Sequence, residues 1–548
     1  MEREARYLPL ARLTGHDRTM HSAQLLIVLA VATVTLGAVT VLRRAGIPAP
    51  VTLVVAGLVI GFLPFVPDVS LNPELVLLGL LPLLVFDAAV TSSPTAFSRD
   101  APMIGVLAVL LVIVTALSVA AVAHWLGHLS WPIAFVLGTA VGPTDAAAAT
   151  SIARRLGLPR RLVTILEGEA LFNDGTALVL YAAAVTAAVS GKFSPAGTAG
   201  SILYSAVAGA AIGLVIGLIG RRLRDRVDDP PLEIAGSILL AYLAYIPAEA
   251  VHASGVLAAV TCGLYLGWHS SGDAFSARSR LQSGAFWQTL VFLVEAFLFV
   301  FTGLSFHTFT REASGPVGRL VLTGTVVVLT VTGVRLFWMW AFGRLIRARR
   351  RYRSLAGSLG WRERTLLGWA GMRGAITLAA LLAVPEVSRT GQPLAGRDEE
   401  VYLGFAVIAG TLILQGLTLP ILVRRLRLRE HPSVADAEIQ ARLEITQAVL
   451  DYLGEVCADR DLPAELTDGL RARYLSRLRR LETMVDGDPE EEATATAAAD
   501  FELRQDLIDM QRGKLAELRD QGRVGATTVR VIEHDLDLEE ARLTGPAR

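Results

Sequence analysis

LEGEALFNDGTALVL, residues 166–180, is apolar enough to lie inside a membrane, yet it contains three carboxylates. They belong to Glu167, Glu169 and Asp174, and Asn173 directly precedes the last of them. A charge at the centre of a bilayer costs about 2.5–3.5 kcal/mol on insertion scales, so acidic residues are rare there. Three acids in one such stretch therefore indicate a functional site.

The composition is that of a multi-span membrane protein. Of 548 residues, 53% are hydrophobic and only 19% are charged, which is too apolar for a soluble protein of this length. We expect an N-terminal tail (1–22), a transmembrane domain (23–424) and a cytoplasmic helical domain (430–548). The two cysteines, Cys262 and Cys457, exclude a disulfide framework and give no metal-binding spacing.

Hydropathy predicts an all-α polytopic protein with about thirteen transmembrane helices, followed by a soluble helical tail. Arginines gather in the loops after the odd-numbered spans, so the positive-inside rule places the N-terminus outside and the C-terminus in the cytoplasm. The expected location is the cell (inner) membrane. The predicted spans are 23–42, 50–66, 74–91, 102–127, 131–154, 162–189, 200–222, 232–249, 251–268, 283–307, 315–345, 363–385 and 401–424.

Two of these spans are interrupted. The fifth contains GTAVGPTDAAAA (138–149), where Pro143 removes a backbone donor and should unwind the helix near Thr144 and Asp145. The twelfth contains GWAGMRGAITLAA (368–380), with two glycines around Arg373. Breaks seven spans apart predict two inverted repeats with a binding site at the midplane. Ordinary packing kinks are the simpler alternative for either break alone.

Acids outnumber bases inside the spans, which indicates a cation path and argues against an anion carrier. Glu169 and Asp174 are five residues apart, about 140° round a helix, so they point in different directions. We expect Glu169 to serve structure and Asp174 to face the ion. The ionisable residues within the spans are Asp87, Asp145, Glu167, Glu169, Asp174, Glu249, His252, Glu295, Arg335 and Arg373.

Three of these have simpler interpretations. Glu167 lies near the cytoplasmic end of its span and can reach water. Glu249 lies close to a span end and is expected to be solvated, and His252 is expected to be packed or hydrogen-bonded. We assign none of the three to the ion.

Five motifs, in this order, resemble the monovalent cation:proton antiporter family of NhaP-type and NHE-type sodium/proton exchangers. The resemblance implies a thirteen-span homodimer in which a core bundle carrying the ion moves against a dimerisation domain. The motifs are GPTDAAAA (142–149), EGEALFNDGTALVLY (167–181), SGVLAAVTCGLYLG (254–267), GMRGAITLAAL (371–381) and LQGLTLP (414–420).

The resemblance also assigns residues. Asp174 matches the family's ion-binding aspartate, and Thr144 and Asp145 match Na⁺ ligands from the unwound fifth span. The pair Asn173–Asp174 resembles the signature of electroneutral exchangers.

Five further residues are compared with the family. Glu169 resembles the acid that pairs with an arginine of the eleventh span, here Arg335, with Arg373 as the second choice. Asp87, Glu295 and Arg373 are candidates for the ion path. Asp87 stands where bacterial relatives usually have Glu, and Glu295 where they often have Asn.

The expected function is therefore exchange of Na⁺, or of K⁺ or Li⁺, for H⁺, serving intracellular pH and sodium homeostasis. No cofactor, enzyme activity or nucleic-acid partner is expected. A K⁺ uniporter or channel is the first alternative, because broken helices and carboxylates also suit it. A membrane-embedded enzyme would need a nucleophile–base pair or metal ligands, and the sequence has no HExxH and no clustered His or Cys. A sensor whose tail is the output is the third alternative.

Overall fold

In the computed structural model, the regular secondary structure of the described residues is entirely helical, apart from one isolated bridge between Val387 and Pro393. The described residues are 47–64, 72–92, 94–191, 195–224, 226, 229–269, 277–312, 316–348, 359–389, 391–428, 432–459, 464–486 and 491–521, with isolated residues before and after these ranges.

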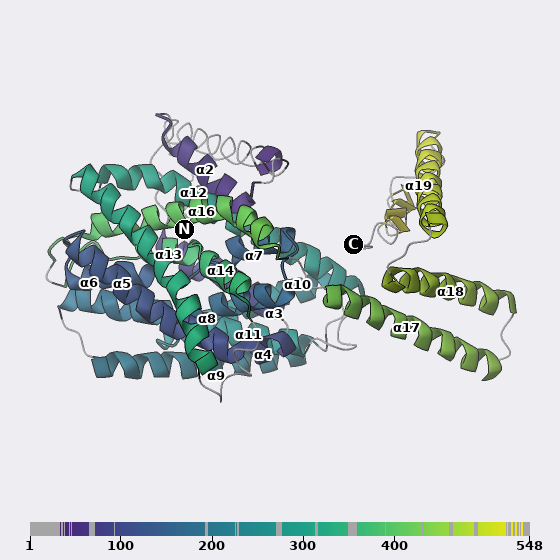
Figure 1. Cartoon of the computed structure of the whole chain (residues 1–548), viewed down its shortest axis with the longest axis horizontal. Helices are drawn as coiled ribbons and strands as arrows, with labels where there is room; N and C mark the ends of the chain where they lie inside the picture. The colour runs from purple at the N-terminus through teal and green to yellow at the C-terminus, as the bar shows by residue number, and fades with distance from the viewer. Residues whose placement is uncertain are drawn as a thin grey trace, which may run out of the picture. The chain divides into compact units, whose positions relative to one another are not determined.

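The chain forms two compact units, residues 1–429 and 430–548. The second contains α17 (Pro432–Asp459), which packs on α18 (Ala464–Asp486), and α19 (Glu491–Asp520). The helices of the first unit (Figure 1) are α2 (Ala49–Gly61), η1 (Leu75–Leu80), α3 (Leu81–Val90), α4 (Pro94–Val106), η2 (Leu107–Leu111), α5 (Val112–Trp125), α6 (Trp131–Ala140), α7 (Ala146–Arg155), α8 (Arg160–Ser190), α9 (Pro195–Arg224), α10 (Pro230–Ala250), α11 (Gly255–Trp268), α12 (Ala277–Glu312), α13 (Val317–Ala348), α14 (Trp361–Trp369), α15 (Ala375–Leu382) and α16 (Arg397–Leu426).

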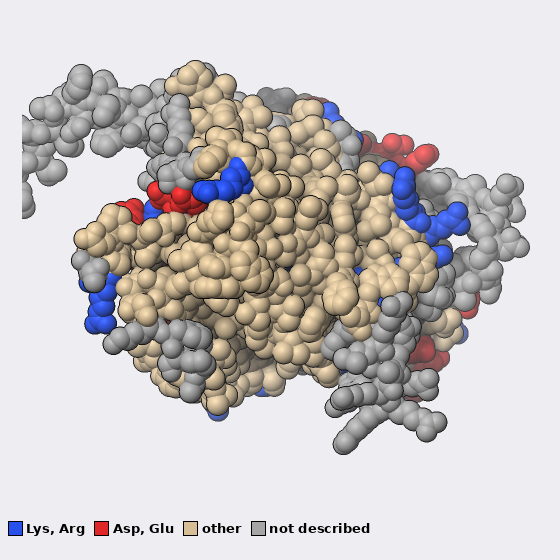
Figure 2. Space-filling view, turned by 60° about the vertical axis from the view of Figure 1, so that its left-hand side comes forward, with Lys and Arg blue, Asp and Glu red and all other residues tan. Residues whose placement is uncertain are grey.

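The first unit is built to cross a membrane several times. Within the described residues, seven helices are long and apolar enough to span one, and four shorter apolar helices accompany them. Figure 2 shows the matching surface, a broad face almost without Lys, Arg, Asp or Glu, with the charged residues gathered near its margins. The seven helices are 98–125, 160–190, 199–224, 230–250, 281–310, 317–341 and 397–426.

Each predicted span from 50–66 to 401–424 overlaps one of these helices or a pair of them. The first predicted span, 23–42, lies mostly outside the described residues, so the number of spans and the inverted repeats stay predictions. The start of α16 differs from the prediction. This helix begins at Arg397, four residues before the predicted span 401–424, so it includes Glu400, which is buried.

Small residues allow some helices to pack almost backbone to backbone. A Cβ added at Gly57 of α2 would lie 2.1 Å from the carbonyl oxygen of Val300 on α12, and one added at Gly303 would lie 2.2 Å from that of Val54. In an apolar solvent, such close packing replaces the hydrophobic effect as the force that joins helices.

Replacing Gly57 by Leu is therefore expected to destabilise the fold by about 1–3 kcal/mol, the usual cost of overpacking. The matched control is Gly333→Leu on α13, because an added Cβ there meets no atom within 4 Å. The melting temperature of the detergent-solubilised protein should fall for the first variant only. Equal melting temperatures would contradict the close contact.

Candidate ion-binding site

Two helices are interrupted where the sequence predicts it. α6 ends at Ala140 and α7 begins at Ala146, because Pro143 cannot continue the hydrogen-bond ladder. The second interruption separates α14 from α15, with residues 370–374 outside any regular secondary structure. The two unwound segments touch, since the backbone N–H of Asp145 donates to the carbonyl of Met372 at 2.8 Å.

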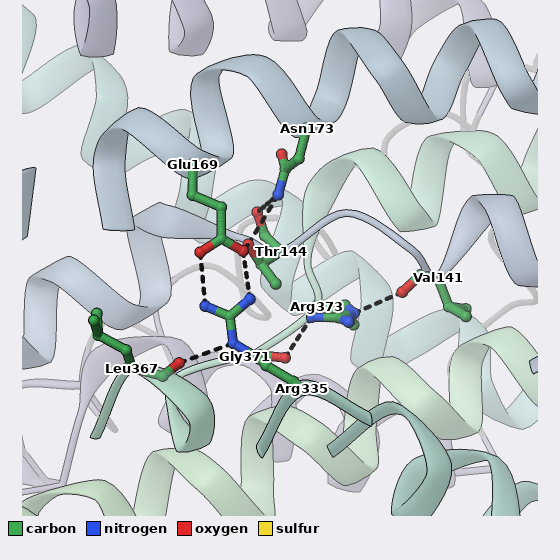
Figure 3. A network of polar contacts seen from close by, with 8 residues as sticks. All are labelled: Val141, Thr144, Glu169, Asn173, Arg335, Leu367, Gly371 and Arg373. Carbon is green, nitrogen blue, oxygen red and sulfur yellow. Dashed lines mark hydrogen bonds and ion pairs between the residues drawn. The ribbon is translucent and has the colours of Figure 1, made fainter. Parts of the chain in front are cut away.

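Arg373 holds this crossing together. Its side chain is buried, and it donates from Nε to the carbonyl of Val141 and from Nη1 to that of Gly371, both at 2.6 Å (Figure 3). Its backbone N–H donates to Thr411 Oγ1 on α16 at 3.2 Å. Unwound backbone inside a membrane protein must find such partners, because no lipid can supply them. These contacts make Arg373 a clamp on the backbone, and its place in the ion path stays a prediction.

Glycine is required where the second break meets the first. A Cβ added at Gly374 would lie 1.7 Å from Oδ2 of Asp145, and one added at Gly371 would lie 2.5 Å from Cδ of Arg335. The glycines flanking Arg373 therefore leave room for two charged side chains.

A second arginine engages the acidic helix. The two terminal guanidinium nitrogens of Arg335 each donate to one carboxylate oxygen of Glu169, Nη1 to Oε1 and Nη2 to Oε2, the latter at 2.8 Å. The third nitrogen, Nε, donates to the carbonyl of Leu367 at 2.9 Å. Each of these two side chains is 2% exposed. The bidentate geometry is the strongest arrangement for such a pair.

The pair extends into a chain of hydrogen bonds (Figure 3). Thr144 donates from Oγ1 to Glu169 Oε1 at 3.1 Å, and Asn173 donates from Nδ2 to Thr144 Oγ1 at 2.9 Å. This chain ties α8 to the first break. A hydroxyl has two lone pairs, so Thr144 keeps one for a further partner.

Asp174 faces elsewhere, into a cavity of about 790 Å³. It is 9% exposed, no ion pair joins it to an arginine within the described residues, and Asp145 lies within electrostatic range. Glu169 does not line this cavity, so the two acids do point in different directions. The charged, hydroxyl and amide side chains in the wall are Asp87, Thr91, Thr144, Asp145, Thr150, Ser151, Glu167, Asp174, Ser283, Gln288, Glu295 and Thr377.

The chemistry of this wall suits a hard cation. Its ligands are carboxylate and hydroxyl oxygens, together with backbone freed near the first break. Among the described residues, no group of three or more His, Cys, Asp and Glu is arranged as a metal centre. An ion at Asp174 therefore needs hydroxyl, carbonyl or water oxygens as well.

A second cavity, of about 780 Å³, has Glu249 and His252 in its wall, two residues that the sequence analysis did not assign to the ion. Glu249 is exposed, and its Oε1 accepts from the backbone N–H of Gly255 at 2.9 Å. His252 is also exposed, at a left-handed backbone position (φ 59°) in the turn after α10. His252 is therefore not packed in the interior, because a tight turn carries it, and the alternative of a hydrogen-bonded histidine stays a prediction.

The sodium/hydrogen exchanger transmembrane family model matches residues 29–425. This chain belongs to that family. An uncharacterised Na⁺/H⁺ exchanger of Mycobacterium tuberculosis is 34% identical over 98% of this chain and 99% of its own length. The Na⁺/H⁺ antiporter ApNhaP of Aphanothece halophytica is 29% identical over 78% of this chain and 80% of its own. The structure of the sodium proton antiporter MjNhaP1 of Methanocaldococcus jannaschii matches with a TM-score of 0.58 at 18% identity, covering 74% of this chain and 99% of that one.

Family membership identifies the chain as a multi-pass membrane transporter of the sodium/proton exchanger type. The likeness to MjNhaP1 shows that the exchanger has the NhaP fold. The expected family is therefore confirmed.

Some contacts of the exchanger had no signal in the sequence. Arg161, at the start of α8, bonds the buried Asp100 of α4 at 2.8 Å. Thr411 and the carbonyl of Leu367 serve the two buried arginines. These partners lie far apart along the chain, so only an alignment of related sequences could have suggested them.

The Glu169–Arg335 pair gives a direct test of this network. Glu169→Leu or Arg335→Leu alone is expected to cost about 3–5 kcal/mol, because each strands a buried charge. The double variant should be less destabilised than the sum of the single ones, since it removes both charges. Thermal unfolding in detergent measures all three, and strictly additive losses would argue against coupling.

Proposed function

We propose that this exchanger moves Na⁺ against H⁺ by letting the two compete for Asp174. The observation that carries the proposal is the position of Asp174, a nearly buried carboxylate in the wall of a cavity beside the broken α6–α7 helix. It has no arginine partner among the described residues, whereas Glu169 on the same helix does.

Competition follows from electrostatics. A carboxylate removed from water favours any partner that cancels its charge, and both a proton and a small cation do so. The proton-loaded and cation-loaded forms can cross the apolar barrier, while the empty form would carry a bare charge through it. Exchange then occurs without any covalent chemistry.

We assign the cation ligands to Asp174, Asp145 and the Thr144 hydroxyl, with carbonyls of residues 142–144 as additional oxygens. Support comes from the shared cavity wall and from the hydrogen bonds that orient Thr144. Asn173 orients that hydroxyl and carries no charge of its own. One titrating aspartate for one monovalent ion supports electroneutral exchange.

Sodium is the first choice of cargo, because ApNhaP and MjNhaP1 are named as sodium/proton antiporters. Potassium and lithium remain alternatives, since the donors are oxygens of no special geometry. Asp87 and Glu295 lie in the cavity wall, where they would attract cations towards Asp174. Intracellular pH and sodium homeostasis is the role that such exchange serves.

We further propose a homodimer in the cell membrane, with the C-terminus in the cytoplasm. The Arg-rich segments between spans support this orientation. It puts the cavity at Asp174 on the cytoplasmic side, because Glu167 in its wall lies two turns from Arg160 and Arg161.

Asp174→Asn is expected to abolish Na⁺-driven proton movement in proteoliposomes while leaving the protein folded, because an amide cannot take up the proton. Glu167→Gln is the matched control, since it removes a charge from the same helix and cavity wall without touching the proposed ligands. Sodium, lithium and potassium are compared across pH. Wild-type exchange in the Asp174 variant would overturn the assignment, and current without proton counterflow would favour a channel.

A second test concerns the unit formed by residues 430–548. All proposed ion ligands belong to the unit of residues 1–429, so a chain ending at Glu430 is expected to keep Na⁺/H⁺ exchange. Complete loss of exchange in a truncated protein that still melts cooperatively would show that the tail is essential.

A further inference from the structure

Glu400 is a second interior acid, which the proposed exchange at Asp174 does not use. It lies in the first turn of α16, is 0% exposed, and neither of its carboxylate oxygens has a hydrogen-bond partner among the described residues. It lines neither cavity. An ionised carboxylate in such surroundings, with no hydrogen bond and no paired cation, is strongly unfavourable.

The residues one turn before and one turn after Glu400 pack against apolar side chains. Gly404, one turn later, lies against Leu381 of α15, and Gly396, one turn earlier, lies against Leu129 ahead of α6. Both α6 and α15 pack on α16, and neither contains a titratable residue.

The charged group nearest to Glu400 along α16 is Arg397, which lies within electrostatic range of it but bonds other residues. Its Nε donates to the carbonyl of Val384 at 3.1 Å, Nη1 lies 3.4 Å from a carboxylate oxygen of Asp398, and Nη2 lies 3.6 Å from one of Glu386. No ion pair joins Arg397 to Glu400 in the described part of the chain. Other titratable groups stand on the elements around α16, and none of them is hydrogen-bonded to Glu400. They include His124 and His128 beside Leu129, Tyr181 on α8, His307 on α12, Arg319 on α13, and Glu399 and Tyr402 on α16 itself.

Tyr181 is the residue of the second cavity that lies within electrostatic range of Glu400. Its hydroxyl donates to the carbonyl of Ala380 at 2.7 Å, and the next residue of α15, Leu381, packs against Gly404, one turn after Glu400. Along α8, Asp174 lines the first cavity and Tyr181, two turns later, lines the second. Glu400 itself lines neither cavity, and its neighbour Tyr181 belongs to the second.

We propose that Glu400 is a second proton-binding carboxyl, protonated in this conformation, which exchanges its proton with the second cavity through the Tyr181 hydroxyl. In this structure the Tyr181 hydroxyl is bonded to the carbonyl of Ala380, so the transfer requires the hydroxyl to rotate towards Glu400. The O–H bond of Tyr181 then breaks as one forms at Glu400, and a cavity water returns a proton to the tyrosine and is left as hydroxide. The bound proton stabilises this conformation, because the ionised acid is costly when buried. Loss of the proton at higher pH favours a conformation that exposes Glu400.

The inference rests on the proposed antiport, because it gives Glu400 control over how exchange depends on pH at the second cavity. It concerns a different residue and a different cavity from the cation site. Failure of one proposal can therefore be told from failure of the other.

The first experiment measures protonation directly, in the full-length protein in lipid. The infrared carbonyl stretch of protonated carboxylic acids is compared between wild type, Glu400→Gln and Glu400→Met, with Glu399→Gln as the control on the same turn. The band should lose intensity in both Glu400 variants and keep it in the control. Glu400→Met keeps the test valid if a buried amide prevents folding, since an apolar side chain of similar size suits this site. An unchanged band in the folded Glu400 variants at every pH would overturn the proposal.

The second experiment measures exchange in proteoliposomes with the pH varied on each side in turn. Replacing Glu400 should shift the pH of half-maximal exchange on one side only, and Tyr181→Phe should slow the response to a pH jump on that side. A lost infrared band with unchanged pH profiles would reduce Glu400 to a structural acid and overturn its role in exchange. If wild type exchanges no ions, the antiport proposal fails, while the infrared result still decides whether Glu400 holds a proton.

Discussion

The structure depends on satisfying unwound backbone inside an apolar bundle. Two helices are interrupted, between α6 and α7 and between α14 and α15. Each break leaves backbone carbonyl and amide groups without helical partners, and lipid cannot bond them. The protein meets this requirement by crossing the two breaks, so that Asp145 bonds Met372 directly and Arg373 bonds Val141 and Gly371. The breaks can persist because each provides partners for the other.

The second organising constraint is charge balance. A buried acid needs a cation, a proton or a network of donors. Glu169 obtains both guanidinium nitrogens of Arg335 and the hydroxyl of Thr144, so its charge is satisfied permanently. Asp174, five residues later on α8, has no such fixed partner among the described residues and opens on a cavity. The difference between a structural acid and an exchangeable one therefore lies in what the neighbouring helices offer.

The same reasoning extends along α8 to the second cavity. On α8, Asp174 lines the first cavity and Tyr181 the second. Tyr181 lies within electrostatic range of Glu400, a buried acid without a hydrogen bond among the described residues. An exchanger of one proton for one cation needs only one titrating carboxyl in its transport site. The second carboxyl is therefore proposed to make the cycle respond to pH at the second cavity.

The sequence by itself determined the class of the protein and the places where its helices break. Long apolar runs and Pro143 act locally, through burial and through a missing backbone donor, so pattern alone predicts them. Asp174 stood out for the same reason, because an acid in an apolar run is costly wherever the run folds. Only the tertiary structure decided which partners each charge has. Arg335 and Glu169 are 166 residues apart, and before the structure only a family resemblance suggested their pairing. Arg373 bonds carbonyls whose identity no side-chain pattern encodes, and Glu400 is buried because neighbouring helices enclose the first turn of α16. Contacts between distant segments set these roles, because a charge inside a membrane protein is defined by the partners that the fold brings to it.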